Sequence, residues 1–192
     1  MIIPSGVLFD LDGVIFQGDR LIPGVEDVIL KLQAAGIPYR FITNTTRLTK
    51  NNLVNMLSKM GFSVTPEEIF AAPHAAVEYC KLKGYKNISL IVPEEEMKED
   101  FSAFQFVDEN PEAIVVGDMG KLFTFELLNR LFINIINGAE LIAMHKNRYW
   151  KSVDGLTLDL GAFISALEYA TGKSAVVVGK PDPNLFKLAI YG

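Results

Sequence analysis

The chain has 192 residues, of which 49% are hydrophobic and 21% charged, an ordinary globular balance that suits one large domain or two small ones. Its formal net charge of −5, without a lysine- or arginine-rich block, argues against a nucleic-acid partner or an anionic membrane surface. Cys80 is the single cysteine, which excludes an internal disulfide and predicts a small buried side chain. Neither a secretory signal nor a membrane span is predicted, so a cytoplasmic location is expected.

The first element is a short apolar strand at residues 6–9 that runs into two carboxylates, Asp10 and Asp12. A buried parallel strand is apolar on both faces, so Asp10 marks the point where the strand leaves the core, at the edge where open α/β sheets bind ligands. Gly13 gives the backbone the freedom to turn there. A metal cation or a shared proton is expected between two carboxylates this close. The alternative is a strand that simply ends in an Asp-based turn.

Residues 14–75 alternate between short strands and amphipathic helices, which predicts a parallel, doubly wound sheet. Strands are expected at residues 14–16, 20–22 and 39–42, and helices at residues 25–35, at residues 53–60 and from Thr65 onward. The first two strands would form a hairpin beside the acidic pair. The third strand delivers Thr43, Asn44 and Thr45 at its end.

Residues 76–172 are long enough to form an inserted domain. Helices are expected at residues 74–83, 125–136 and 162–171, strands at residues 88–92, 113–116 and 141–144, and a turn at Asp154-Gly155. The mixed charges of residues 94–100 predict a solvated helix face. A last buried strand at residues 175–178 ends in Gly179-Lys180-Pro181.

Three predicted strand ends thus carry reactive side chains: Asp10 with Asp12, Thr43 with Asn44, and Lys180. They supply a carboxylate nucleophile, an acid or base, an anion-binding hydroxyl and a fixed positive charge. A carboxylate nucleophile can accept a phosphoryl group as an aspartyl-phosphate. Phosphoryl transfer depends mainly on positioning and on neutralising charge at the transferring oxygens. The residue types therefore suit phosphoryl transfer.

In this order, Asp10-Leu11-Asp12-Gly13, Thr43-Asn44 and Gly179-Lys180-Pro181 resemble the first three motifs of the haloacid-dehalogenase-like phosphatases. The insertion between the second and third motifs is similar to the large α/β cap domain found in one branch of these phosphatases. The Thr-Asn-Thr-Thr, His-Lys-x-Arg-Tyr and Leu-Glu-Tyr-Ala-Thr stretches most resemble the phospholysine phosphohistidine inorganic pyrophosphate phosphatase group and its hydrolase-domain relatives.

The resemblance implies an α/β fold with a doubly wound, Rossmann-like core at residues 1–75 and 173–192 and an α/β cap at residues 76–172. It implies that Asp10 attacks phosphorus and binds Mg²⁺, and that Asp12 acts as acid and base with its main-chain carbonyl on the metal. Thr43, Asn44 and Thr45 would hold the phosphoryl oxygens, and Lys180 would steady both Asp10 and the phosphate. The substrate would be a small phosphate ester, phosphoamide or pyrophosphate.

Two further expectations concern the cap and the end of the chain. His145 and Arg148 follow a predicted strand in a polar loop, where contacts with the leaving group are expected, although both also suit an ordinary loop. The family's fourth motif, a Gly-Asp pair that supplies another metal carboxylate, has no match after Lys180, so the C-terminal part of the core is expected to be missing. Gly117-Asp118 imitates that motif but precedes Lys180. An incomplete core sheet predicts self-association, for example as a homodimer.

Two other functions fit parts of this pattern. A signalling receiver also uses acids, Thr and Lys-Pro, but it pairs its acids adjacently and places its nucleophile on a middle strand, whereas here Asp-x-Asp lies on the first strand. The stronger alternative is a truncated, catalytically weak or inactive relative that binds a phosphate-bearing ligand or a partner.

Overall fold

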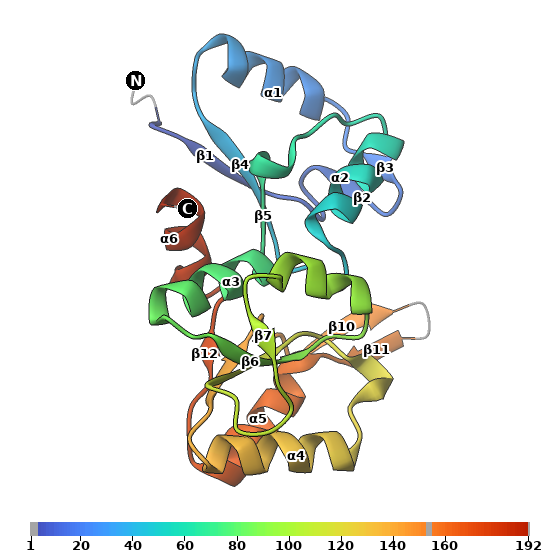
Figure 1. Cartoon of the computed structure of the whole chain (residues 1–192). Helices are drawn as coiled ribbons and strands as arrows, with labels where there is room; N and C mark the ends of the chain where they lie inside the picture. Colours follow the sequence, from blue (N-terminus) through green and yellow to red (C-terminus); the bar gives the residue numbers. More distant parts are fainter. Residues whose placement is uncertain (1–3, 153–154, 192) are drawn as a thin grey trace.

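The computed structural model describes residues 4–152 and 155–191, which form two parallel β-sheets with helices between and outside them (Figure 1). The α/β class with a parallel sheet is therefore confirmed. In this described part of the chain, no helix combines the length and the apolar character needed to cross a membrane.

The first sheet has three parallel strands in the order β1-β4-β5. Their bounds are Val7–Asp10 for β1, Tyr39–Thr43 for β4 and Ile69–Ala71 for β5. Successive side chains of a strand point to opposite faces. Phe41 of β4 accordingly packs in one cluster with α1 (Val25–Ala34) and α2 (Lys50–Lys59), while its neighbour Ile42 packs in another with α3 (Ala72–Lys83). Burial on both faces explains the apolar strand sequences.

The second sheet has five parallel strands in the order β12-β9-β8-β6-β7. Their bounds are Asn87–Ile91 for β6, Gln105–Phe106 for β7, Ala113–Val116 for β8, Glu140–Ala143 for β9 and Val176–Val177 for β12. On one face, Ile114 and Val116 pack with α4 (Phe125–Ile136) and α5 (Leu160–Thr171); on the other, Val115 packs with α3 and α6 (Pro183–Tyr191).

Helices α3 and α6 form a layer between the two sheets (Figure 1). One apolar cluster joins Ile42 and Phe70 of the first sheet, Ile142 of the second sheet, and Cys80 and Leu185 of these helices. Cys80 is fully buried, as predicted, and burial raises the pKa of its thiol to about 12. This shared cluster packs the first sheet against α3, α6 and the second sheet.

The strand expected at residues 175–178 is present as β12, but it pairs with β9 of the second sheet. The physical reason is the crossover from β9 to β12, in which α5 packs on the second sheet and returns the chain to that sheet. The assignment of residues 173–192 to the core and residues 76–172 to the cap stays a prediction, and its first boundary falls inside α3.

Several local predictions can be compared directly with the structure. The hairpin beside the acidic pair is confirmed as β2 (Phe16–Gln17) and β3 (Arg20–Leu21). The helix expected from Thr65 is a single 3₁₀ turn, η1 (Pro66–Glu68), because β5 follows at once. Another 3₁₀ turn, η3 (Gly120–Leu122), precedes α4. Asp154 of the expected turn lies outside the described residues.

Residues 95–101 form the 3₁₀ helix η2 (Glu95–Phe101), and its residues Glu95, Glu96 and Glu99 are exposed, in agreement with the solvated face expected at residues 94–100. The same helix also buries Met97 and Phe101 fully and Asp100 by about half, which the charge pattern did not indicate. The hairpin of β10 (Tyr149–Ser152) and β11 (Gly155–Leu158) was not predicted. Its apolar side chains Leu156 and Leu158 are exposed, so no core-facing alternation marks it as a strand pair.

Strand β1 ends the first sheet, and within residues 4–152 and 155–191 it pairs with β4 alone. A hollow of about 530 Å³ lies beside it, lined by Ser5, Gly6, Val7, Leu8, Pro38, Tyr39, Arg40, Ala189 and Ile190. Strand edges of this kind can pair with another chain. The expected self-association stays a prediction, and the edge of β1 is where we expect a second chain to pair.

A polar cluster joins α2, α3 and η2. Asp100 Oδ2 accepts the backbone N–H of Lys50 at 3.2 Å and lies 3.8 Å from His74 Nε2. His74 Nδ1 accepts the N–H of Ala71 at 3.4 Å, at the start of α3. Burial, and secondarily the charge of Lys50, lowers the pKa of His74 to about 3. His74 is therefore neutral in the folded chain at pH 7.

Replacing His74 with glutamine should weaken the pH dependence of stability between pH 7 and pH 5.5. The unfolded chain takes up a proton at His74 near pH ~6.5, whereas the folded chain does so only near pH 3. Stability is thus present above that unfolded pKa and is lost as the pH falls. The loss attributable to His74 over this interval is roughly 1 kcal/mol. Glutamine can still accept the N–H of Ala71, because glutamine serves at this capping position.

The measurement is urea unfolding of both proteins at each pH. The wild type should lose roughly 1 kcal/mol more than His74→Gln on acidification. Equal losses in the two proteins would contradict a neutral buried His74.

Candidate functional site

The acidic pair lies where β1 ends. Asp10 is the last residue of β1, its carboxylate is 41% exposed, and its Oδ1 accepts the backbone N–H of Leu11 at 2.8 Å. Gly13 has a φ of 77°, a left-handed conformation that favours glycine, and lets the chain turn into the β2-β3 hairpin. Asp12 is exposed at this turn. The sequence predicted both the strand end and the turn.

The neighbouring strand β4 ends in Thr43, whose side chain is buried. Thr43 Oγ1 accepts the N–H of Thr45 at 3.1 Å and lies 3.0 Å from Thr45 Oγ1. Asp10 aligns with Ile42 in the parallel register, so this threonine pair follows directly beside the end of β1. The structure thus brings the first two sequence motifs to one edge of the first sheet.

Lys180 reaches the same edge from the second sheet. Its Nζ lies 2.5 Å from Asp10 Oδ1, and its side chain is 19% exposed. The backbone of Lys180 is bonded to the side chain of Asn44 through both its N–H and its carbonyl. Asp10, Asn44 and Lys180, which come from three separate motifs, therefore lie together.

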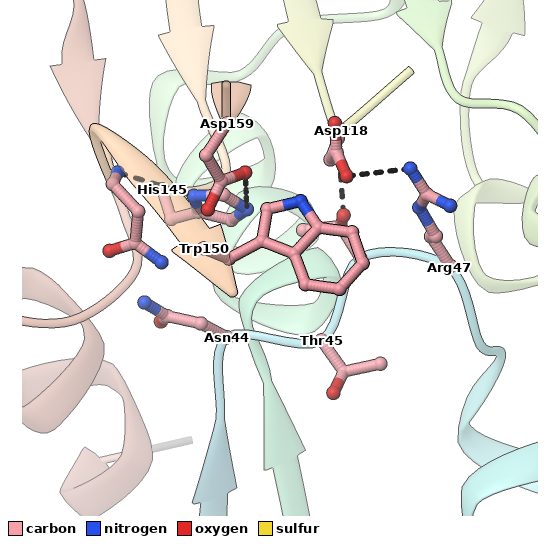
Figure 2. Close-up of a pocket in the computed structure, with 9 residues that line it drawn as sticks. Asn44, Thr45, Arg47, Asp118, His145, Trp150 and Asp159 are labelled. Carbon is pink, nitrogen blue, oxygen red and sulfur yellow. Dashed lines mark hydrogen bonds and ion pairs between the residues drawn. The ribbon is translucent and has the colours of Figure 1, made fainter. Parts of the chain in front are cut away.

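A pocket of about 330 Å³ opens next to these residues (Figure 2). It is lined by Asn44, Thr45, Thr46, Arg47, Asp118, His145, Asn147, Trp150 and Asp159. The walls come from the loops after β4, β8 and β9, from β10 and from the residue before α5, and the indole of Trp150 lies across the pocket in the view of Figure 2. Asn44 and Thr45 therefore lie both directly after β4 and in the wall of this pocket.

His145 is buried in the wall of this pocket, with its Nε2 3.8 Å from Asp159 Oδ1. Its Nδ1 accepts the N–H of Asn147 at 3.4 Å, and Asp159 Oδ1 accepts the N–H of Leu160 at the start of α5. Burial lowers the pKa of His145, although the charges of Asp159 and Asp118 favour its protonated form. The imidazole is consequently neutral at pH 7, and because Nδ1 accepts the N–H of Asn147, its Nε2–H is the group that can donate a hydrogen bond.

On the opposite wall, Arg47 and Asp118 form an ion pair with Nη2 and Oδ2 2.7 Å apart (Figure 2). The backbone N–H of Asp118 also donates to Thr46 Oγ1 at 3.1 Å. These contacts join the loop after β4 to the loop after β8. Asp118 is thus paired with an arginine, which gives the Gly117-Asp118 sequence a role other than that of the family's fourth motif.

Arg148 does not line this pocket. It is exposed and lines a separate hollow of about 500 Å³ with Lys146, Tyr149, Gly161, Ala162 and Ser165. Sequence reasoning missed Arg47, Trp150 and Asp159 as pocket residues. The position of Arg47 directly after Thr43-Asn44-Thr45-Thr46 is a signal that could have identified it.

A divalent cation is expected beside Asp10 and Asp12. Within residues 4–152 and 155–191, no three Asp, Glu, His or Cys side chains are grouped so that they could hold a metal ion. Mg²⁺, however, usually keeps several waters and takes one or two carboxylates together with substrate phosphate oxygens. The carboxylate of Asp10 and the oxygens of Asp12 are the right donor types for that ion. Asp182 Oδ1 instead accepts the N–H of Asn184 near the start of α6.

Comparisons with known proteins agree with this geometry. The model of the family described as haloacid dehalogenase-like hydrolase matches residues 7–107. Haloacid dehalogenase-like hydrolase domain-containing protein 2 of Rattus norvegicus is 40% identical over 97% of this chain and 70% of its own length. Phospholysine phosphohistidine inorganic pyrophosphate phosphatase of Xenopus laevis is 36% identical over 97% of this chain and 67% of its own length.

Solved structures of phosphatases are also similar to this chain. The p-nitrophenyl phosphatase from Archaeoglobus fulgidus is 28% identical, with a TM-score of 0.87 over 97% of this chain and 73% of that chain. The 4-nitrophenylphosphatase from Thermotoga maritima is 27% identical, with a TM-score of 0.85 over 96% of this chain and 71% of that chain. The motifs, the fold and these relatives agree, and this chain belongs to the phosphohydrolases of the haloacid dehalogenase-like hydrolase family.

Proposed function

We propose that this chain is a Mg²⁺-dependent phosphatase that hydrolyses a small phosphate ester, phosphoamide or pyrophosphate through an aspartyl-phosphate on Asp10. The observation that carries the proposal is the contact of 2.5 Å between Asp10 Oδ1 and Lys180 Nζ, next to the end of β4. An accessible carboxylate beside a fixed cation suits attack on a phosphoryl group. The names of the relatives, among them two nitrophenyl phosphatases, support the same reaction class.

In the proposed first step, an oxygen of Asp10 forms a bond to phosphorus while the bond from phosphorus to the leaving group breaks. Asp12 donates its proton to the leaving atom. In the second step Asp12 takes a proton from water, the water oxygen attacks phosphorus, and Asp10 is released with inorganic phosphate. Thr43, Thr45 and Lys180 would bind the phosphoryl oxygens and neutralise their charge. Bound Mg²⁺ would supply Lewis-acid stabilisation worth several kcal/mol.

The pocket would hold the leaving group. We assign residues 1–75 and 173–192 to a catalytic core and residues 76–172 to a cap that covers the site and excludes water. Trp150 offers an aromatic face, and neutral His145 offers hydrogen bonds at the pocket wall. Arg148, outside the pocket, would meet only a substrate that extends beyond it.

Removal of Mg²⁺ tests this function. With p-nitrophenyl phosphate, phosphate release should fall at least ~100-fold in excess EDTA, because the Lewis-acid stabilisation is lost. Release should return when Mg²⁺ exceeds the chelator. Release that does not depend on a divalent ion would contradict the proposal. Phosphate binding without any release would favour the alternative of an inactive, phosphate-binding relative.

A further inference from the structure

The side chain of Asn44 is bonded to the backbone of Lys180 at both ends. Asn44 Nδ2 donates to the carbonyl oxygen of Lys180 at 2.9 Å, and the N–H of Lys180 donates to Asn44 Oδ1 at 2.7 Å. A primary amide has donors on nitrogen and acceptor sites on oxygen, so this pairing also fixes which way the amide points. The contact joins residues that are 136 positions apart in the sequence.

The turn before Lys180 is tightly packed against the same side chain. A Cβ at Gly179 would lie 2.8 Å from Asn44 Oδ1 and would collide with the carbonyl oxygen of Met144. Glycine is therefore needed at position 179 because two segments approach its Cα closely. Asn44 and Met144 hold this turn between the end of β4 and the end of β9.

The opposite end of Lys180 faces Asp10, with Nζ 2.5 Å from Oδ1. Asp10 is the last residue of β1, and Asn44 directly follows β4, which is adjacent to β1 in the first sheet. Lys180, in contrast, follows β12 of the second sheet. The bonds from Asn44 thus connect the residue that carries the cation to the sheet that carries the proposed nucleophile. These bonds use one of the two N–H donors of Asn44 Nδ2 and fix the orientation of the whole amide.

We propose that Asn44 is a positioning residue, which holds the backbone of Lys180 so that its ammonium group lies against Asp10 and the transferring phosphoryl group. This inference rests on the proposed phosphatase function. It differs from the family-based expectation that Asn44 binds the phosphoryl oxygens itself. In this role Asn44 contributes to catalysis only through Lys180. The contribution can still be large, because a cation displaced by about 1 Å can cost ~100-fold in rate.

The test is a double-mutant cycle with Asn44→Ala, Lys180→Ala and both changes together. We measure kcat and KM for p-nitrophenyl phosphate and, separately, the affinity for orthovanadate, which does not require turnover. Asn44→Ala alone should lower kcat/KM by roughly 10²-fold and weaken vanadate binding. In the Lys180→Ala background the same change should have less than about a threefold effect, because residues that act as a unit are not additive.

Asn184→Ala is the matched control. The Nδ2 of Asn184 donates to the carbonyl oxygen of Val177 at 3.2 Å, so the amide of this asparagine also bonds to the backbone near the end of β12, but at Val177 and not at Lys180. We expect near-wild-type kinetics and vanadate affinity from it. Thermal unfolding of every variant confirms that the loss in Asn44→Ala is not a loss of folded protein.

The outcomes separate the two proposals. Full, multiplicative effects of the two changes on vanadate affinity would show that Asn44 binds the phosphoryl group directly and would overturn the inference. Coupled effects on vanadate affinity in a chain without phosphatase turnover would support the inference and overturn the proposed function. A wild-type chain that neither binds vanadate nor releases phosphate would overturn both.

Discussion

Asp10→Asn should abolish phosphate release, with a fall of ~10⁴-fold or more. An amide is a poor nucleophile and a poor ligand for Mg²⁺, so both proposed roles of Asp10 are lost together. The fold should survive, because the amide oxygen of asparagine can still accept the N–H of Leu11 that Asp10 Oδ1 accepts now. Steady-state assays with p-nitrophenyl phosphate and acid quench of a phosphate-labelled intermediate measure the effect.

Asp19→Asn is the matched control for this substitution. Asp19 is exposed in the loop between β2 and β3 and lies 3.8 Å from Arg20 across a solvated ion pair. Such pairs contribute little to stability, so turnover should stay close to that of the wild type. Near-normal activity in Asp10→Asn would rule out Asp10 as the nucleophile.

Asp12→Asn should lower kcat by about 10²–10⁴-fold, the usual contribution of general acid–base catalysis. The loss should be greater for an alkyl phosphate than for p-nitrophenyl phosphate, because a poor leaving group needs the proton from Asp12 more. Asp12 is exposed at the turn after β1, so its replacement should leave thermal stability unchanged. Kinetics with the two substrates measure this difference.

The same two substrates serve as each other's control. Equal losses for both would contradict a proton transfer from Asp12 to the leaving group. A change in unfolding temperature would instead indicate that Asp12 supports the turn at Gly13.

The local sequence determined the parts of this protein that depend on neighbours along the chain. Continuous apolar runs predicted β1 and β8, because a strand buried on both faces is apolar on both, and Tyr39, Phe41 and Ile42 predicted β4 although Arg40 interrupts the run. Helical spacing predicted α4, and the Asp-x-Asp-Gly pattern placed the acidic pair at a strand end. The weakest predictions concerned η2 and the β10-β11 hairpin, whose charged or exposed sequences carry no clear apolar period.

Only the tertiary structure decided which distant side chains meet. Lys180 was expected near Asp10 by resemblance. The hydrogen bonds of its backbone to Asn44, and the pairing of β12 with β9 in the second sheet, depend on how α3, α5 and α6 pack. The burial that keeps His145 neutral comes from packing around a loop that looked polar in sequence. Periodicity reports the environment of each residue, whereas contacts between residues 44 and 180 are set by packing across the whole chain.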